Sequence, residues 1–448
     1  MRFIWLGFFL IPPLLSFAQE SEKALIFSPD IHFRTFWMST SYPEDFKDDY
    51  ALGASLNLGG KITYRENFKF HIGYRSFANI WSSDISVLDP LTGQSNRYET
   101  GLFDLLDPED KFFGKLETFS FEYSNSKWGA KVGRMGINSD WINAQDGRLS
   151  PTAVEGLTTW FLPSDKWKIN LWGIGRMSIR GSSSWFDIGE TVGIYPVGRN
   201  TEGKPSQYFR NTESDWIGIW EVNHKLKNEE FNFSQTLVQN ISSTYWGRWE
   251  RNWLIHRTKE KILLGLQAGF QHGIGEGGNA DPSLKYKDPN DQNWAISGRI
   301  GYSNPNWATH LNYTKVGGSG RWLSSREWGK DAWYTFIPRE RNEGFEKVDA
   351  VVGYAEYRFP KNQFQIYAHL GLHWLSDIGD AAANKYAFSS YRQINLGLKY
   401  KPEFAKNWDF HFLVMNKKAL GDQVLTPNQR YNKVELIHIN AMVNWRLN

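Results

Sequence analysis

The stretch "FKFHIGYR", residues 68–75, alternates apolar and polar side chains one by one. One face of this segment would carry Phe68, Phe70, Ile72 and Tyr74. A period of two is typical of a β-strand, because successive side chains point to opposite faces. The final segment, 434–447, repeats the alternation. Both segments are therefore predicted to be strands with one apolar and one polar face.

Eighteen segments along the chain show this pattern. They are 31–40, 49–58, 66–80, 114–124, 127–136, 153–162, 166–178, 213–224, 230–241, 249–257, 261–272, 292–301, 306–316, 347–358, 363–373, 391–400, 407–416 and 434–447. Short connections such as 125–126 alternate with long ones such as 317–346.

An even strand count, with short turns at one end and long loops at the other, is typical of a transmembrane barrel. Closure leaves no unpaired strand edge in lipid. The predicted fold class is all-β, a transmembrane antiparallel β-barrel of about 18 strands with long extracellular loops and short periplasmic turns. A soluble β-sandwich or propeller, the alternative, would not require this alternation of connections.

The composition fits such a barrel. Aromatic residues make up 16% of the chain, with 22 tryptophans, although the mean hydropathy is -0.52. Tryptophan and tyrosine collect at the two membrane interfaces of such barrels. The chain has no cysteine, which excludes disulfides and thiolate metal sites. Its 51 basic and 48 acidic residues are interspersed, so no nucleic acid partner is expected.

The first residues, "MRFIWLGFFLIPPLLSFAQ", resemble a secretory signal. Arg2 precedes an apolar run, and Ser16 and Ala18 form a small-residue cleavage site. A membrane anchor, the alternative, needs roughly 20 apolar residues, and Pro12 and Pro13 interrupt this run. We expect residues 1–18 to be removed, leaving 19–448 as a single barrel in the outer membrane of a Gram-negative bacterium.

Motifs that would indicate a cofactor or a metal ion are weak. "GIGEGG", 273–278, is followed by prolines rather than by the helix that a dinucleotide site needs. His369 and His373 lie roughly 13 Å apart on a strand, too far to share one ion. The acidic loop residues Asp104, Asp107, Glu109 and Asp110 lack the ligand spacing of a calcium loop. The sequence therefore predicts no cofactor and no metal, although calcium binding at this loop stays open.

An outer-membrane-embedded hydrolase would need a serine, a histidine and a carboxylate within hydrogen-bond reach. No short motif brings a serine near a histidine. The chain is therefore not predicted to be an enzyme.

Basic residues recur at the inward phase of widely separated strands. They are Arg75, Lys131, Lys168, Arg176, Arg299, Arg358, Lys399 and Arg446. As a set they predict an electropositive lumen, because guanidinium forks bind carboxylates and a series of weak sites lets an anion move on. In the alternative interpretation they only balance inward acids such as Glu122 and Asp409.

The alternation stops in "VGRMGINSDWINAQDGRLSPTAVEG", residues 132–156. This stretch resembles the third-loop region of OprD-type outer-membrane porins. The resemblance is carried by Gly133, Arg134, Asp146, Arg148, Pro151, Glu155 and Gly156. The stretch Ser324–Gly344, "SSREWGKDAWYTFIPRERNEG", and the final segment "NKVELIHINAMVNWRLN" are also similar to that family.

The resemblance implies that a loop at about 134–153 folds into the lumen and narrows it. The expected constriction residues are Arg134, Asp140, Asp146 and Arg148. Alternatively, Asp146 and Arg148 bond each other or the backbone to hold the loop in place.

The implied function is diffusion of small anionic or carboxylate-bearing solutes through a narrow basic lumen. An exporter of an anionic polysaccharide, similar to the alginate-type barrel, needs a basic lumen too, and a structural or adhesive barrel would have a plugged one. The expected partners are outer-membrane lipid, the barrel assembly machinery and a small-molecule solute, with the chain a monomer or a loose trimer.

Overall fold

The computed structural model describes residues 25–447 except 44, 146, 196–197 and 256–258. The expected signal segment, 1–18, lies outside the described residues, and so does Asp146.

Nineteen strands form within the described part of the chain. They are β1 (Leu25–Ser41), β2 (Asp49–Tyr64), β3 (Phe68–Ser82), β4 (Phe112–Ser124), β5 (Trp128–Gly136), β6 (Ala153–Ser164), β7 (Trp167–Ser178), β8 (Phe186–Asp187), β9 (Ile217–Lys225), β10 (Glu229–Val238), β11 (Ser242–Leu254), β12 (Lys261–Gly273), β13 (Gln292–Ser303), β14 (Trp307–Gly318), β15 (Val348–Arg358), β16 (Phe364–Leu375), β17 (Tyr391–Tyr400), β18 (Trp408–Ala419) and β19 (Leu436–Leu447).

Helical structure in the described residues is limited to single turns. These are η1 (Thr100–Leu102), η2 (Gly189–Thr191), η3 (Pro360–Asn362), η4 (Glu403–Ala405) and α1 (Pro427–Arg430). No described helix has the length and apolar character needed to cross a membrane.

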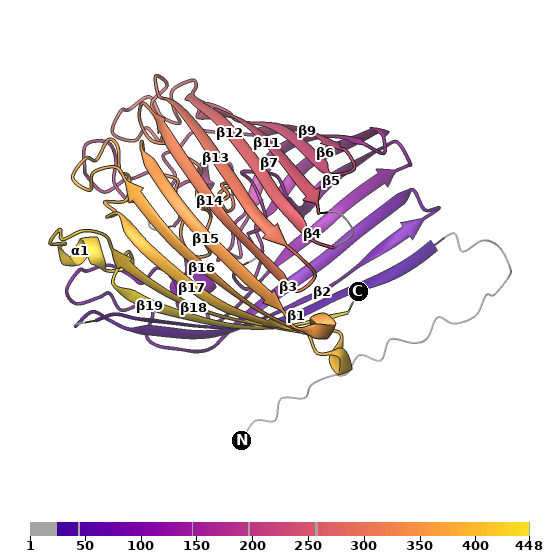
Figure 1. The fold of residues 1–448 in the computed structure, drawn as a ribbon, viewed down its shortest axis with the longest axis horizontal. Helices are drawn as coiled ribbons and strands as arrows, with labels where there is room; N and C mark the ends of the chain where they lie inside the picture. Colours follow the sequence, from indigo (N-terminus) through magenta and orange to yellow (C-terminus); the bar gives the residue numbers. More distant parts are fainter. Residues whose placement is uncertain (1–24, 44, 146, 196–197, 256–258, 448) are drawn as a thin grey trace.

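The strands close into a ring (Figure 1). Each long strand pairs antiparallel with its neighbour in the chain, and β1 pairs with both β2 and β19. The two-residue β8 pairs only with the end of β7, and β7 pairs directly with β9, so β8 is an addition to the wall. The result is a closed antiparallel barrel of eighteen long strands, which confirms the predicted fold class.

Side-chain burial follows the predicted alternation. In β19, Asn440 and Asn444 are buried inside the barrel, whereas Ile437 and Leu447 are exposed on its outer face. Each of the eighteen predicted segments overlaps one strand. The largest difference is at β11, which begins at Ser242 rather than at 249. The next is at β1, which begins at Leu25 rather than at 31, because Ser28, Pro29 and Asp30 interrupt the apolar alternation while the backbone still pairs with β2.

Candidate pore constriction

The loop between β5 and β6, residues 137–152, lies inside the barrel near its mid-height. Arg34, in the middle of β1, donates a hydrogen bond from Nη1 to the carbonyl oxygen of Arg148 at 2.7 Å. Ser55, in β2, donates from Oγ to the carbonyl oxygen of Leu149 at 2.9 Å. Both donors are buried on the inner face of the wall. The loop therefore crosses the lumen instead of projecting into solvent.

An apolar cluster holds this loop against the wall. Trp141 packs against Trp246 of β11 and against Trp322 and Trp333 of the loop between β14 and β15, with ring centroids 5.2, 5.5 and 4.9 Å apart. All four tryptophans are almost fully buried. The contacts with Trp246 and Trp333 are edge-to-face, a geometry that adds to the stabilisation from burial of apolar area. We call these four residues the tryptophan cluster.

Hydrogen bonds join the same two loops. The Asn143 backbone N–H donates to the carbonyl oxygen of Trp328 at 3.0 Å, and the Asn143 side chain donates to the carbonyl oxygen of Lys330 at 3.1 Å. In return, the Lys330 N–H donates to Asn143 Oδ1 at 3.0 Å. The loops 137–152 and 319–347 therefore form one inward-folded unit.

These loops, together with those after β3 and β7, enclose a narrow cavity of about 80 Å³. Its charged lining residues are Arg97, Arg148, Arg180, Arg326, Arg339, Arg341 and Glu340. Tyr98, Tyr195 and Gln145 contribute polar groups that are not charged. We call the six arginines with Glu340 the arginine eyelet.

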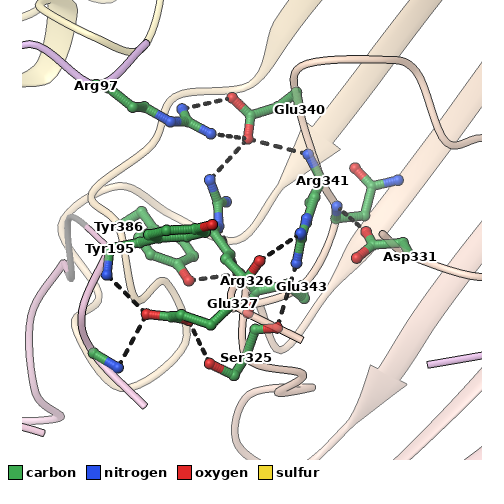
Figure 2. A network of polar contacts seen from close by, with 12 residues as sticks. Arg97, Tyr195, Ser325, Arg326, Glu327, Asp331, Glu340, Arg341, Glu343 and Tyr386 are labelled. Atoms are coloured by element: carbon green, nitrogen blue, oxygen red, sulfur yellow. Dashed lines mark hydrogen bonds and ion pairs between the residues drawn. The ribbon is translucent and has the colours of Figure 1, made fainter. Parts of the chain in front are cut away.

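Glu340 is the carboxylate of the arginine eyelet and is surrounded by cations (Figure 2). Arg97 forms a two-pronged pair with it at 3.0 and 3.1 Å, and Arg326 lies 3.1 Å from its Oε1. Lys417 of β18 is a third partner. Burial alone would raise the pKa of the Glu340 carboxyl, but the charges of Arg97, Lys417 and Arg326 outweigh it and hold the pKa well below its usual value.

Three other arginines donate to neutral oxygens. Arg148 donates to the carbonyl oxygen of Gly147 at 3.1 Å, Arg339 to Asn440 Oδ1 at 2.7 Å, and Arg341 to the carbonyl oxygen of Arg326 at 2.7 Å. Among the described residues, no ion pair joins these three side chains to a carboxylate.

The pKa values of these three arginines reflect this environment. Burial, with the neighbouring Arg339 charge, lowers the pKa of Arg148 to about 9. Burial also lowers the pKa of Arg339 and of Arg341 to about 10, and the charge of Arg180 adds to both shifts. Buried cations that repel one another favour the entry of an anion.

A larger cavity of about 620 Å³ lies toward the short turns and is called here the lower chamber. Its lining carries charges of both signs, from Asp140, Lys168, Glu221, Lys225, Glu230, Arg248, Glu250, Arg299, Lys330 and Asp331. Lys225 and Glu230 flank the turn between β9 and β10, which fixes the end of the barrel at which the chamber lies.

Of the four residues predicted for the constriction, the three that the structure describes lie in different places. Arg148 lines the arginine eyelet. Asp140 lines the lower chamber, where it accepts a hydrogen bond from Ser234 Oγ at 2.8 Å and burial raises its pKa. Arg134 pairs with Glu155 at 2.7 Å and lies 4.7 Å from the Trp185 ring, away from the eyelet lining. Asp146 is outside the described residues.

Four of the basic residues predicted to line the lumen face carboxylates. Arg75 pairs with Glu117 at 2.7 Å, Lys131 lies 3.8 Å from Glu122, Arg176 lies 3.2 Å from Asp187, and Arg358 contacts Glu356. For these four residues, the structure shows the alternative interpretation of the sequence, in which basic side chains balance neighbouring acids.

The other four basic residues are placed differently. Lys168 and Arg299 line the lower chamber. Lys399 lies 5.3 Å from the Tyr367 ring, and Arg446 is exposed at the end of β19. The predicted row of basic residues is thus dispersed along the wall.

Sequence reasoning missed most of the arginine eyelet. Arg326, Arg339, Glu340 and Arg341 lie in the stretch 324–344, whose resemblance to the porin family was the available signal. Arg97 and Arg180 lie in long loops without any period, and no local pattern marks them.

Comparisons with known proteins identify the fold. No family model and no curated protein sequence matches the chain. Among solved structures, OpdK of Pseudomonas aeruginosa with vanillate is 11% identical, with a TM-score of 0.69 over 94% of this chain and 98% of that one. OccAB3 of Acinetobacter baumannii is 14% identical, with a TM-score of 0.72 over 94% and 99%. A BenF-like porin of Pseudomonas fluorescens is 12% identical, with a TM-score of 0.71 over 94% and 98%. The chain therefore has the fold of the OprD-type outer-membrane porins, as the resemblance in its sequence predicts.

Proposed function

We propose that the chain is an outer-membrane porin through which small, carboxylate-bearing anions diffuse. The observation that carries this proposal is the arginine eyelet, in which six arginines and one glutamate line a cavity of about 80 Å³. Glu340 forms ion pairs with Arg97 and Arg326. Arg148, Arg339 and Arg341 therefore supply the excess positive charge.

The size of the eyelet favours small solutes over a polymer. An anion that leaves water must be compensated by cations, and guanidinium groups supply both charge and paired donors. Because Arg148, Arg339 and Arg341 act in a narrow space, one solute carboxylate would meet several donors in succession. The lower chamber, with charges of both signs, would then return the solute to a weaker electrostatic environment.

The apolar outer face of the barrel and the fold of its structural neighbours support an outer-membrane location. Lipid of that membrane, the barrel assembly machinery and the solute would be its partners. We propose that one chain forms a complete pore, because the barrel closes on itself.

Two measurements test the proposal. In a planar bilayer with a potassium chloride gradient, the reversal potential should indicate preference for chloride. In proteoliposomes, benzoate should enter faster than benzyl alcohol, which has a similar size and no charge. A cation preference, or equal entry of the two solutes, would contradict the proposed selectivity. A protein without conductance would instead support the plugged barrel.

A further inference from the structure

Glu340 occupies a complete carboxylate-binding site. The fork of Arg97 donates from Nη1 to Oε2 at 3.0 Å and from Nη2 to Oε1 at 3.1 Å. Arg326 and Lys417 approach the same carboxylate from the loop between β14 and β15 and from β18. A planar guanidinium fork that donates to both oxygens is a common way in which proteins recognise a carboxylate.

Two of the three cations that bind Glu340 also face the pore. Arg97, Arg326 and Glu340 all line the arginine eyelet, whereas Lys417 is buried behind them. The site in the eyelet with the most ionic contacts is therefore filled by a carboxylate of the protein. A solute is left with Arg148, Arg339 and Arg341.

We propose that Glu340 determines how long a carboxylate solute stays in the eyelet, by acting as a resident carboxylate that competes for Arg97. This inference rests on the proposed function. A channel conducts only if each site releases its occupant. With Glu340 in place, Arg97 is saturated and the solute moves between arginines that each offer weaker contacts. Without the Glu340 charge, the Arg97 fork, which lines the eyelet, would hold the solute.

Neighbouring acidic residues determine which cations would be left without an ion-pair partner if Glu340 were neutralised. Arg326 also pairs with Glu343, at 2.7 Å, and Tyr386 donates to the same oxygen of Glu343. Arg326 would therefore keep an anionic partner (Figure 2). Among the described residues, Arg97 and Lys417 form ion pairs with Glu340 alone, and of the two only Arg97 lines the eyelet, so the effect should act through Arg97.

The test compares single-channel blocking by benzoate in the natural protein and in Glu340→Gln. Each blocking event measures the residence time of one solute. We expect residence about tenfold longer or more in Glu340→Gln, since a hydrogen-bonded pair with a charged group contributes that much or more to binding. Events with benzyl alcohol should not change. Glu229→Gln is the matched control, because Glu229 pairs with Arg251 at 3.1 Å on the opposite face of the wall from the lower chamber.

Removing one partner of a buried ion pair destabilises a protein strongly, so a second variant removes the buried cation as well. Glu340→Gln combined with Lys417→Met leaves the Arg97 fork free without an unpaired lysine. It should also lengthen benzoate residence. Unchanged residence in both variants, or in the double variant if the single one does not fold, would overturn the inference and leave Glu340 as a structural cross-link. If the natural protein prefers cations, the proposed function fails instead.

Discussion

The ring of Trp141, in the inward-folded loop, stands edge-on to the ring of Trp246 on the barrel wall, with centroids 5.2 Å apart and planes at 83°. Trp246 belongs to β11, four strands along the wall from β6, whereas Arg34, which binds the carbonyl oxygen of Arg148, belongs to β1, four strands from β5 in the other direction. These two attachments lie on opposite sides of the ring, so the loop is held to the wall at both sides of the lumen as well as at its two strands. An attachment at both ends makes a fixed constriction rather than a hinged one.

Replacing Trp141 with alanine should loosen this attachment. Truncation of a buried tryptophan costs about 3–5 kcal/mol, which is enough to release the end of the loop. We expect higher and noisier single-channel conductance, and removal of residues 138–145 should act in the same direction. Trp253→Ala is the control, because Trp253 is exposed on the outer face. Unchanged conductance in a folded Trp141→Ala barrel would show that the contact does not hold the constriction.

Neutralising Arg148 should reduce the preference for anions more than neutralising Arg176. Arg148 lines the eyelet and donates to neutral oxygens, whereas Arg176 already lies 3.2 Å from Asp187. We expect Arg148→Gln to lower the chloride-to-potassium permeability ratio by about two- to fivefold at low salt, with a smaller change at high salt because of screening. Reversal potentials at two salt concentrations measure both effects. Equal shifts for Arg148→Gln and Arg176→Gln would contradict the assignment.

The strands of the barrel could be predicted from the sequence, whereas most residues of the arginine eyelet could not. In 68–75 the polarity of each side chain indicates the face of the strand on which it lies, so the strand and its two faces can be predicted from residues two positions apart. The eyelet depends on pairs such as Arg97 with Glu340, 243 residues apart along the chain. Such pairs arise only when long loops meet inside a closed ring. Arg134 illustrates the limit, since its place in the motif did not reveal that Glu155 across the strand pair would bind it.

Asp331 should make the selectivity depend on pH. It lines the lower chamber, and burial raises its pKa to about 6, although the nearby charge of Arg341 opposes the shift. As the pH falls from about 7 to about 5, Asp331 takes up a proton and the chamber loses a negative charge. The preference for anions should therefore increase with acidification, and Asp331→Asn should show the stronger preference already at neutral pH. Reversal potentials across this range provide the measurement.

The same shift predicts the direction of a stability change. The pKa of Asp331 in the folded barrel is above its value of about 3.9 in an unfolded chain. The native state therefore binds the proton first, and the free energy of unfolding should rise as the pH falls from about 7 to about 4. In Asp331→Asn this contribution should be missing. Denaturant titrations at several pH values measure this contribution, and a free energy of unfolding that falls with acidification over this range would contradict the prediction.

Cysteines introduced one at a time at two adjacent positions of β7 should differ in their reaction with aqueous thiol reagents. Asn170 lines the lower chamber, and Leu171, the next residue, is exposed on the lipid-facing side. Cysteine at 170 should react in membranes, and cysteine at 171 should be protected. The chain has no cysteine of its own, so the background is nil. The reverse pattern would mean a register shift by one residue, which turns every side chain to the other face.

The pairing of β1 with β19, from Ile31 opposite Leu447 to Ser41 opposite Ile437, joins the first described strand to the last. During synthesis β1 is made before all other described strands and β19 after them. Without β19, the facing edges of β1 and β18 would expose unpaired N–H and C=O groups, which are templates for aggregation. A chain truncated before residue 436 would therefore lack β19 and could not close the barrel in this way, however well its loops pack.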